Sequence, residues 1–478
     1  MQVRRVIFLF FFISSCAFVR PTVGTKPYSS KEIKNLYAKI EEILTDSLLK
    51  PATCGICAVS LGTGQVIYER NSHKLLLPAS NMKLITSLAA LYLLGPSYKF
   101  ETHFYIDSTE TLYIKGFGDP TLSYEDLLII AERFKAKGLK SLEKIVVDNY
   151  FFDSLEMGPG WMWDEGSYPY AARISALSLN ENIIEIWVNT AENVGDIVKV
   201  NLIPPTRCVE LKVEAITLPA DSVSKIEVNR VFDAKNKIIV KGGLPIFSSP
   251  KVFYRNLENP PLYTGGVFKE ILEREGISVK NGILRGSVPK SAELFYIHKS
   301  PPLSEIIRKL NKFSSNFIAE QILKTLGAIF LNPPGTWEKG EEVIKEFLQD
   351  MGLDTISIRM VDGSGLSRYN LLSANQIVSV LIKAAKDFSI SPEFFSSLPI
   401  GGVDGTLLLR MQDTLLLGKV RAKTGTLWGV SSLSGYVATK NNDIIAFSIL
   451  MNNFLGSVDD IRKIQDKIVR ILAEFPKE

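Results

Sequence analysis

Ser80 and Lys83 are the two residues of this chain whose types and spacing best suit covalent chemistry. Ser80 comes before an apolar run, residues 82–94, that Gly95-Pro96 ends, so the pattern predicts a helix with Ser80 as its N-cap. In that helix the two side chains share one face, one turn apart. The hydroxyl can then act as a nucleophile and the amine as its base, because burial and the helix N-terminus lower the pKa of a lysine.

The Ser-x-x-Lys spacing is not diagnostic by itself. It also occurs at Ser47/Lys50, Ser141/Lys144, Ser222/Lys225, Ser248/Lys251 and Ser287/Lys290. Only the copy at Ser80 opens a long apolar helix, so its context selects it. The alternative interpretation is a capped core helix with no catalytic role.

A second candidate is Lys423-Thr424-Gly425-Thr426, which is expected at the end of a strand. A lysine beside small hydroxyl residues can bind a carboxylate through charge and hydrogen bonds. Gly425 leaves room for a substrate to approach the strand edge. The alternative is a strand that ends in a polar turn.

A third candidate is Ser314-Ser315-Asn316, which lies between two stretches with helical periodicity. This position suits the presentation of side chains into a cleft. Ser-x-Asn also occurs at Ser178/Asn180 and Ser373/Asn375, so helix capping is the alternative interpretation.

Length and composition limit the classes of protein that fit. The chain has 478 residues, 46% hydrophobic and 22% charged, as in soluble globular proteins, and its length indicates two or three domains. The formal charge of +4 is too small and too dispersed to indicate binding to nucleic acid. The three histidines lack metal-ligand spacing, which argues against zinc chemistry and against a Ser-His-Asp triad.

The two ends of the chain share one pattern of expected secondary structure, hairpin strands with amphipathic helices, whereas the middle of the chain has a different pattern. Residues 25–95 and 287–478 are expected to form one domain of the α/β (α+β) class, with a large insertion after the Ser80 helix. Residues 96–182 and 255–286 predict an inserted α/β domain. Residues 183–254 show only short β-rich segments and predict an inserted β-rich domain.

Residues 1–24 read as a signal peptide. Arg4-Arg5 is followed by an apolar run, Val6 to Ile13, that is too short to span a bilayer, so export is expected. Ile13-Ser14-Ser15-Cys16 resembles a bacterial lipobox, which would put a lipid anchor on Cys16. Plain cleavage after Ala17 or near Gly24 is the equal alternative.

Three cysteines remain after the signal peptide. Cys54 and Cys57 have the spacing of a redox pair, but they lie in an expected strand, where residues three apart point to opposite faces. Two ordinary strand cysteines are therefore favoured over a redox or metal role. Cys208 is isolated, so no disulfide framework is expected.

The three candidate stretches follow one another in the order that is the signature of penicillin-binding proteins and serine β-lactamases. The long gap between Ser80 and Ser314 resembles that of the D-alanyl-D-alanine carboxypeptidase/endopeptidase family of class C low-molecular-mass penicillin-binding proteins, which carry two extra domains in this gap. The likeness also includes Gly116-Phe117-Gly118-Asp119-Pro120, Ile174-Ser175-Ala176-Leu177-Ser178, Ser300-Pro301-Pro302-Leu303, Asp362-Gly363-Ser364-Gly365-Leu366-Ser367 and residues 398–407. One departure is Ser315, a variable position where many relatives are expected to carry aspartate.

The resemblance implies a transpeptidase-like domain, an antiparallel sheet flanked by helices, that works without cofactor or metal. It implies an acyl-enzyme on Ser80, with Lys83 as general base. The other implied catalytic residues are Ser314, Asn316 and Lys423. Thr424, Gly425 and Thr426 are the implied substrate-binding residues. The implied oxyanion hole consists of the backbone N–H groups of Ser80 and Thr426.

The implied partners are peptidoglycan stem peptides ending in D-Ala-D-Ala, with β-lactam antibiotics as covalent inhibitors, in the periplasm or on the outer face of a bacterial membrane. Asp148 matches a family position where an inserted-domain carboxylate meets a stem-peptide amine; a turn aspartate at a strand end is the alternative. Two rival functions stay open: a β-lactamase or esterase of the same fold, and a non-catalytic peptidoglycan-binding protein.

Overall fold

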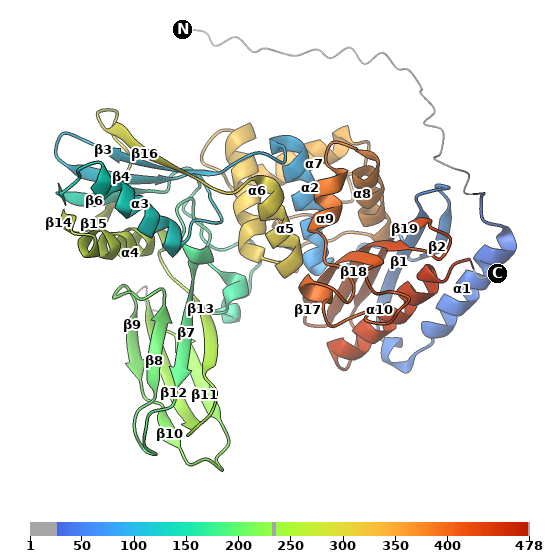
Figure 1. Ribbon diagram of the computed structural model, residues 1–478. Helices are drawn as coiled ribbons and strands as arrows, with labels where there is room; N and C mark the ends of the chain where they lie inside the picture. Colours follow the sequence, from blue (N-terminus) through green and yellow to red (C-terminus); the bar gives the residue numbers. More distant parts are fainter. Residues whose placement is uncertain (1–25, 232–235, 477–478) are drawn as a thin grey trace, which may run out of the picture.

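Five strands from the two ends of the chain form the central sheet of the main domain. The computed structural model describes residues 26–231 and 236–476 (Figure 1). The sheet is antiparallel, in the order β17-β18-β19-β1-β2. Its strands are β1 (Thr53–Ser60), β2 (Val66–Arg70), β17 (Val420–Leu427), β18 (Val430–Ala438) and β19 (Ile444–Asn452).

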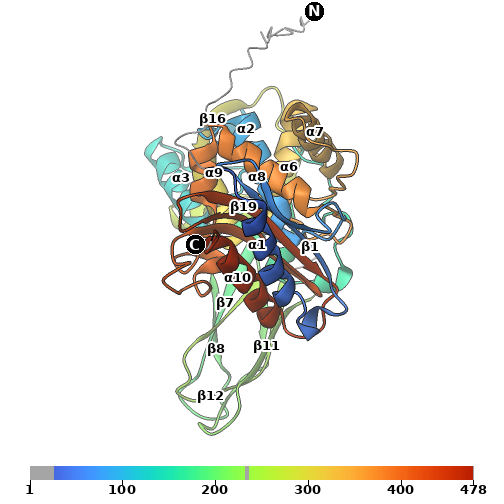
Figure 2. The same ribbon diagram turned by 90° about the vertical axis from the view of Figure 1, so that its right-hand side faces the viewer.

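Two helices, α1 (Ser30–Ile43) and α10 (Val458–Ala473), cover one face of this sheet and lie side by side (Figure 2). Their apolar stripes, which contain Ile40 and Ile468, belong to the same buried cluster as Cys54 of β1. The other face packs against α2 and α8, and Cys57 belongs to that second cluster. The two cysteines therefore lie on opposite faces of the sheet, as the strand pattern predicts, and both are free.

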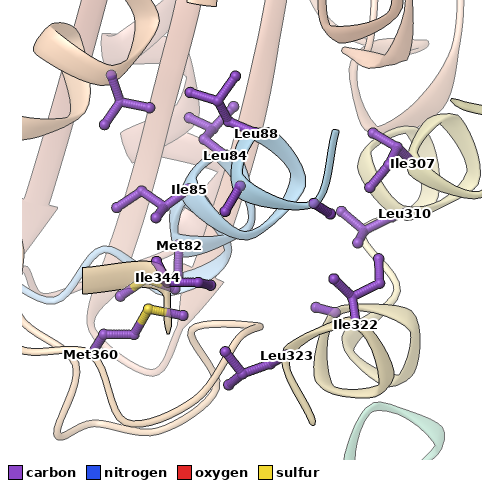
Figure 3. Packing of buried hydrophobic residues seen from close by; sticks show 14 of the residues in the cluster. Met82, Leu84, Ile85, Leu88, Ile307, Leu310, Ile322, Leu323, Ile344 and Met360 are labelled. Atoms are coloured by element: carbon purple, nitrogen blue, oxygen red, sulfur yellow. The ribbon is translucent and has the colours of Figure 1, made fainter. Parts of the chain in front are cut away.

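The second face carries a group of helices built around α2 (Met82–Leu94). Residues 82–91 of α2 are all buried, because helices from later in the chain surround it. Figure 3 shows Leu84, Ile85 and Leu88 of α2 among side chains from these neighbours. The neighbours are α5 (Leu303–Phe313), α6 (Asn316–Phe330), α7 (Trp337–Asp350), α8 (Ala374–Lys386) and α9 (Ser391–Ser397).

The start of α2 differs from the expected cap. Ala79–Asn81 forms a 3-10 turn before the α-helix, and Ser80 lies inside this turn rather than at its cap. Ala79 has φ 46°, a left-handed conformation that turns the chain sharply before Ser80. The prediction that Ser80 caps the helix is therefore wrong, and its hydroxyl is available for other contacts.

The first inserted domain is a mixed sheet in the order β15-β6-β4-β3-β16, with α3 (Tyr124–Ala136) and α4 (Pro260–Arg274) packed against it. Strand β16 pairs with β3, so the expected boundary at residue 287 is wrong: the pairing keeps the chain in this domain through Lys299. The strands are β3 (Glu101–Ile106), β4 (Thr111–Gly116), β6 (Lys144–Asp148), β15 (Ile283–Arg285) and β16 (Glu293–Lys299), with the separate pair β5 (Ser141–Leu142) and β14 (Ser278–Val279).

The second inserted domain is β-rich and extends away from the main domain (Figure 1). One sheet has the order β13-β7-β8, and the other joins β9, β10, β11 and β12. The apolar residues of these strands share one buried cluster with the first inserted domain. The strands are β7 (Ile183–Asn189), β8 (Lys199–Ile203), β9 (Glu210–Val213), β10 (Ile216–Leu218), β11 (Lys225–Arg230), β12 (Lys237–Pro245) and β13 (Lys251–Asn256).

Short 3-10 turns complete the fold at Ser47–Leu49, Trp163–Glu165, Pro169–Ala171, Asn180–Asn182 and Gly405–Leu407. The signal peptide expected over residues 1–24, with Cys16, lies outside the described residues. Within residues 26–231 and 236–476, the helices are all too short or too polar to cross a membrane.

Candidate active site

Lys83 is the centre of a buried hydrogen-bond cluster. Its Nζ lies 2.8 Å from the Ser80 hydroxyl, 2.6 Å from the Asn316 side-chain oxygen and 2.8 Å from the carbonyl oxygen of Ser364. The amine is fully buried, whereas Ser80 is partly exposed. A serine hydroxyl in contact with a buried amine is the arrangement that an activated nucleophile requires.

Ser314 and Lys423 form the second half of the cluster. Lys423 Nζ donates to the Ser314 hydroxyl at 2.7 Å and to the carbonyl of Thr424 at 2.8 Å. The Asn81 side-chain amide donates to the carbonyl of Lys423 at 2.9 Å, which ties β17 to the turn that carries Ser80. The structure therefore brings Ser80, Lys83, Ser314, Asn316 and Lys423 together in one place.

The link between α5 and α6 explains why Ser314 points into this cluster. Ser314 ends α5 in the left-handed conformation, with φ 60° and ψ 37°. Ser315 then caps α6, because its hydroxyl accepts from the N–H of Ile318. The capping interpretation thus holds for Ser315, and Ser314 and Asn316 are left to face the cleft.

Strand β17 ends at Leu427, directly after the Lys-Thr-Gly-Thr stretch, so this stretch lies at the end of a strand as expected. The pairing runs on to Leu427 and Val430, where the β17–β18 turn begins. At Gly425, an added Cβ would lie 2.2 Å from the Ser432 hydroxyl and 2.9 Å from the backbone nitrogen of Ser80. Only glycine allows the strand to lie this close to Ser80.

Two buried carboxylates behind Lys83 carry contacts that the sequence motifs do not indicate. Glu320, one turn after Asn316 on α6, accepts from the N–H groups of Gly363 and Ser364 at 2.9 and 2.7 Å. Asp362 accepts from the N–H of Gly365 and from the indole of Trp161. Both carboxylates shape the glycine-rich loop whose Ser364 carbonyl contacts Lys83. For Glu320, the available signal in the sequence was its spacing from Asn316, which places both side chains on the same face of a helix.

Burial, together with neighbouring charges, shifts the pKa values of both lysines. Burial lowers the pKa of Lys83 to about 7, although the charges of Glu320 and Asp362 act to raise it. Burial, and then the nearby charge of Lys83, lower the pKa of Lys423 well below its usual value. Burial raises the pKa of Glu320 to about 7, with the neighbouring Asp362 acting in the same direction. A fraction of Lys83 is therefore neutral near pH 7 and can accept a proton.

Ser80 opens into a cleft of about 1180 Å³. Ser314, Asn316 and residues 424–428 line the same cleft, together with Glu165, Tyr170, Arg368 and Arg462. Arg462 donates to the hydroxyl of Thr426 at 3.2 Å, and the hydroxyl of Thr424 lies 2.8 Å from that of Thr406. The cleft thus presents hydroxyls and positive charge beside the serine, a combination that suits a carboxylate group.

Asp148 is not among the residues that line this cleft. It lies buried at the end of β6, where it accepts from the N–H groups of Tyr150 and Val288 at 3.1 and 3.0 Å and lies 3.7 Å from Lys115. These contacts are those of the turn aspartate at a strand end. No cluster of three metal-ligating side chains occurs among the described residues.

Known proteins resemble this chain over almost its whole length. Residues 36–475 match the model of the D-Ala-D-Ala carboxypeptidase 3 (S13) family. The D-alanyl-D-alanine carboxypeptidase of Actinomadura sp. (strain R39) is 36% identical over 469 residues, which are 94% of this chain and 86% of that protein. DacB of Haemophilus influenzae, also a D-alanyl-D-alanine carboxypeptidase, is 27% identical over 421 residues, covering 86% of this chain and 88% of that protein.

The fold agrees with these sequence matches. The crystal structure of penicillin binding protein 4 (dacB) from Haemophilus influenzae has a TM-score of 0.80 and 26% sequence identity, covering 91% of this chain and 98% of that chain. The same protein complexed with a β-lactam has a TM-score of 0.74 at 25% identity, with the same coverage. On the extent of the family match and on the identity to its relatives, this chain belongs to the D-Ala-D-Ala carboxypeptidase 3 (S13) family.

Proposed function

We propose that this chain is a serine D-Ala-D-Ala carboxypeptidase that cleaves the terminal peptide bond of peptidoglycan stem peptides. The observation that carries the proposal is the 2.8 Å contact between Ser80 Oγ and the buried Nζ of Lys83. This contact lies in a cleft that also contains Ser314, Asn316 and the 424–426 segment of β17. Membership of the family and its named relatives support the reaction class.

In the acylation step, the Ser80 hydroxyl attacks the carbonyl carbon between the two D-alanines, while neutral Lys83 takes the hydroxyl proton. The oxyanion is held by the backbone N–H groups of Ser80 and Thr426, and such donors are typically worth about 3–4 kcal/mol of barrier. The C–N bond then breaks, a proton passes through Ser314 to the leaving amine, and D-alanine departs. Ser80 is left as an ester of the shortened peptide.

The terminal carboxylate is bound beside β17. Lys423 donates a hydrogen bond of 2.7 Å to the Ser314 hydroxyl, and the hydroxyls of Thr424 and Thr426 donate to the carboxylate. Arg462, which contacts Thr426 at 3.2 Å and pairs with Asp459 at 2.8 Å, places a guanidinium group at that end of the cleft. This preference for a free carboxylate makes the enzyme a carboxypeptidase.

Water hydrolyses the ester and regenerates Ser80. A penicillin acylates the same serine, but its cleaved amide stays tethered in the cleft, so hydrolysis is slow. Stable labelling by penicillin therefore separates this function from an efficient β-lactamase of the same fold and from a non-catalytic peptidoglycan-binding protein.

The decisive experiment combines two measurements on purified protein. Wild-type enzyme should be labelled covalently by fluorescent penicillin on Ser80 and should release D-alanine from muropeptides, both read by mass spectrometry. Ser80→Ala should lose both activities while keeping its circular dichroism spectrum. Labelling that persists in Ser80→Ala, or turnover of penicillin faster than release of D-alanine, overturns the assignment.

We also propose export, in keeping with a substrate in the cell envelope. Residues 1–24 would direct the chain to the periplasm or to the outer face of the membrane, with Cys16 as the lipid-bearing residue. Mass spectrometry of the mature N-terminus checks this directly. A lipid on Cys16 that Cys16→Ser removes supports the anchored form, and an unmodified N-terminus after Ala17 or near Gly24 supports the soluble form.

A further inference from the structure

One wall of the cleft is a segment of the first inserted domain. Residues 166–171, here called the wall segment, include Tyr170, which lines the cleft. The backbone carbonyl of Tyr170 accepts a hydrogen bond of 2.8 Å from the side-chain NH₂ of Asn316. The wall segment therefore contacts the cluster around Lys83 directly.

This hydrogen bond fixes which end of the Asn316 amide faces Lys83. A carbonyl can only accept, so the Tyr170 carbonyl selects the NH₂ end of the amide. The oxygen end is then directed to Lys83, whose Nζ lies 2.6 Å away. Movement of the Tyr170 carbonyl would release Asn316 and leave the amine of Lys83 with one partner fewer.

The wall segment is held in turn by Asn256, the last residue of β13 in the β-rich domain. Asn256 is fully buried, and its side-chain NH₂ lies 2.9–3.0 Å from the carbonyl oxygens of Gly166, Tyr168 and Ala171. Its backbone N–H donates to the carbonyl of Ser167 at 3.0 Å. One asparagine thus contacts four carbonyl groups of the wall segment.

Charged groups fix Asn256 from the other side. Arg230 of β11 donates from Nε to the Asn256 side-chain oxygen at 3.2 Å and pairs with Glu258 at 2.6 Å. Glu258 also pairs at 2.9 Å with Arg173, just after the wall segment. Although burial acts to raise the pKa of Glu258, its hydrogen bonds and charge contacts with the two arginines lower it overall, so it is ionised at neutral pH.

An aromatic contact adds to this support. The rings of Tyr168 and Tyr170 are stacked, with centroids 5.5 Å apart and planes 8° apart. The guanidinium of Arg255, next to Asn256 on β13, lies over the Tyr168 ring at 5.6 Å. Tyr168 is about half exposed, so this contact can be changed without opening the core.

We infer that Asn256 is a positioning residue for the acylation step: it holds the wall segment so that the Tyr170 carbonyl keeps Asn316 directed at Lys83. The inference rests on the proposed function, since it assigns Asn316 to the catalytic cluster. It gives the β-rich domain a role in the reaction, although the described strands of that domain contribute no residue to the cleft lining. The contacts run from β13 through the wall segment to α6.

Asn256→Asp is the sharpest test, because it keeps the shape and the oxygen that Arg230 contacts but removes both donated hydrogens. A carboxylate would also repel the three carbonyls of the wall segment. The measurement is the second-order rate constant for acylation by fluorescent penicillin, expressed per titratable active site. We expect this rate constant to fall about tenfold to a hundredfold, as for other small displacements of catalytic groups.

The control is Thr217→Val in the same β-rich domain. Thr217 is also fully buried, and its hydroxyl accepts from the N–H of Ala191 at 2.8 Å, but it lies on β10 at the far end of the domain (Figure 1). A merely structural effect lowers the number of titratable sites and leaves the rate constant of each site unchanged, which is the result expected for Thr217→Val. The per-site rate constant therefore separates positioning from stability.

A wild-type rate constant per site in Asn256→Asp overturns the inference. If Asn256→Asp does not fold, Tyr168→Ala decides the question, and it should lower the same rate constant because the wall segment loses its stacked support. An unchanged per-site rate in Tyr168→Ala then overturns the inference. Failure of wild-type enzyme to be labelled on Ser80 would instead contradict the proposed function, so the two failures are distinguishable.

Discussion

Two lysine side chains are fully buried, each in contact with one serine of the site, and their environments differ. Lys83 contacts Ser80, and burial lowers its pKa to about 7 although the charges of two buried carboxylates, Glu320 and Asp362, act to raise it. Lys423 contacts Ser314 and the carbonyl of Thr424, and burial, followed by the like charge of Lys83, lowers the pKa of its amine well below the usual value. Because only Lys83 of the two donates to the Ser80 hydroxyl, we propose Lys83 as the base of the reaction.

Acylation should depend on pH through Lys83. The amine must be neutral to take the proton of Ser80, so the rate of acylation should rise as pH increases through about 7, the pKa of Lys83. The measurement is the rate of labelling by fluorescent penicillin from pH 5 to 9. A rate that is flat across this range would exclude Lys83 as the titrating base.

Glu320→Gln should shift the rise of the acylation rate with pH to lower pH. The negative charge of Glu320 raises the pKa of Lys83, so its removal lowers that pKa and leaves more neutral amine at a given pH. The midpoint of the rate profile, measured per titratable site, checks the direction. A midpoint that moves to higher pH contradicts the assigned electrostatic contact.

Gly425→Ala should abolish most of the acylation while the protein stays folded. The added Cβ would lie 2.2 Å from the Ser432 hydroxyl and 2.9 Å from the Ser80 nitrogen, so β17 must move away from the nucleophile. A displacement of this kind typically costs on the order of a hundredfold in rate. Gly282→Ala, which meets no atom within 4 Å, is the control and should acylate at the wild-type rate.

At the scale of elements, helix α2 positions Lys83 and the turn that carries Ser80, because residues 82–91 of the helix are all buried. Figure 3 shows side chains of α5, α6 and α7 around it, and these helices also carry Ser314, Asn316 and Glu320 or support them. The packing of one helix therefore sets the distances among residues that are far apart in the sequence.

Leu88→Ala should show this dependence as a loss of stability. Leu88 is fully buried on α2, and truncation of a buried leucine typically costs about 2–5 kcal/mol of the free energy of unfolding. The loss in the free energy of unfolding is measured by urea unfolding, in which the folded fraction is monitored by the penicillin labelling that is retained. Tyr92→Ala, at a half-exposed position of the same helix, should cost clearly less, and equal losses at both positions would contradict this account of α2.

The sequence predicts the elements that carry the motifs better than their ends. The apolar run at 82–94 predicts α2, but the left-handed φ of Ala79, which removes Ser80 from the cap, has no signal in an alanine. The strand that carries Lys423 is predicted, whereas its last residue, Leu427, is set by pairing with Val430 of β18. Helix α8 was not predicted, although Ser373 and Gln376 form a capping box before an apolar period.

Some residues of the candidate site can be predicted from the sequence, and others cannot. Residues that recur in short motifs, such as Ser80 and Lys423, are predicted from their types and spacing. The contacts of Asn316 with the Tyr170 carbonyl, and those of Glu320 with the glycine-rich loop, join segments distant in the chain through backbone groups. Backbone groups carry no signature in the sequence, so only the three-dimensional structure reveals these contacts.

At the scale of the whole molecule, the hydrophobic core is divided unequally. The two inserted domains share one buried cluster, whereas the main domain has two, one on each face of its sheet. Part of the first inserted domain, including Phe152, Trp161 and Ile174, packs into the core of the main domain around α2. The insertion is therefore anchored in the buried cluster that also contains α2.

Calorimetry should reflect this division. We expect two unfolding transitions, one for the main domain and one for the two inserted domains together, because the latter share a core. Acylation by penicillin should raise the midpoint of the main-domain transition, since the ligand binds only the folded cleft. A ligand-induced shift of equal size in both transitions would contradict the division.

The order of the strands also has a consequence for biosynthesis. Strand β1 lies between β2 and β19, and Thr53 pairs with Asn452, so a growing chain presents one edge of β1 unpaired until nearly all residues have been made. Lys423 and the rest of β17 also emerge late. A nascent chain thus carries Ser80, the proposed nucleophile, through synthesis with no cleft around it, and a product truncated before β19 would keep Ser80 and Lys83 without the complete sheet beside them.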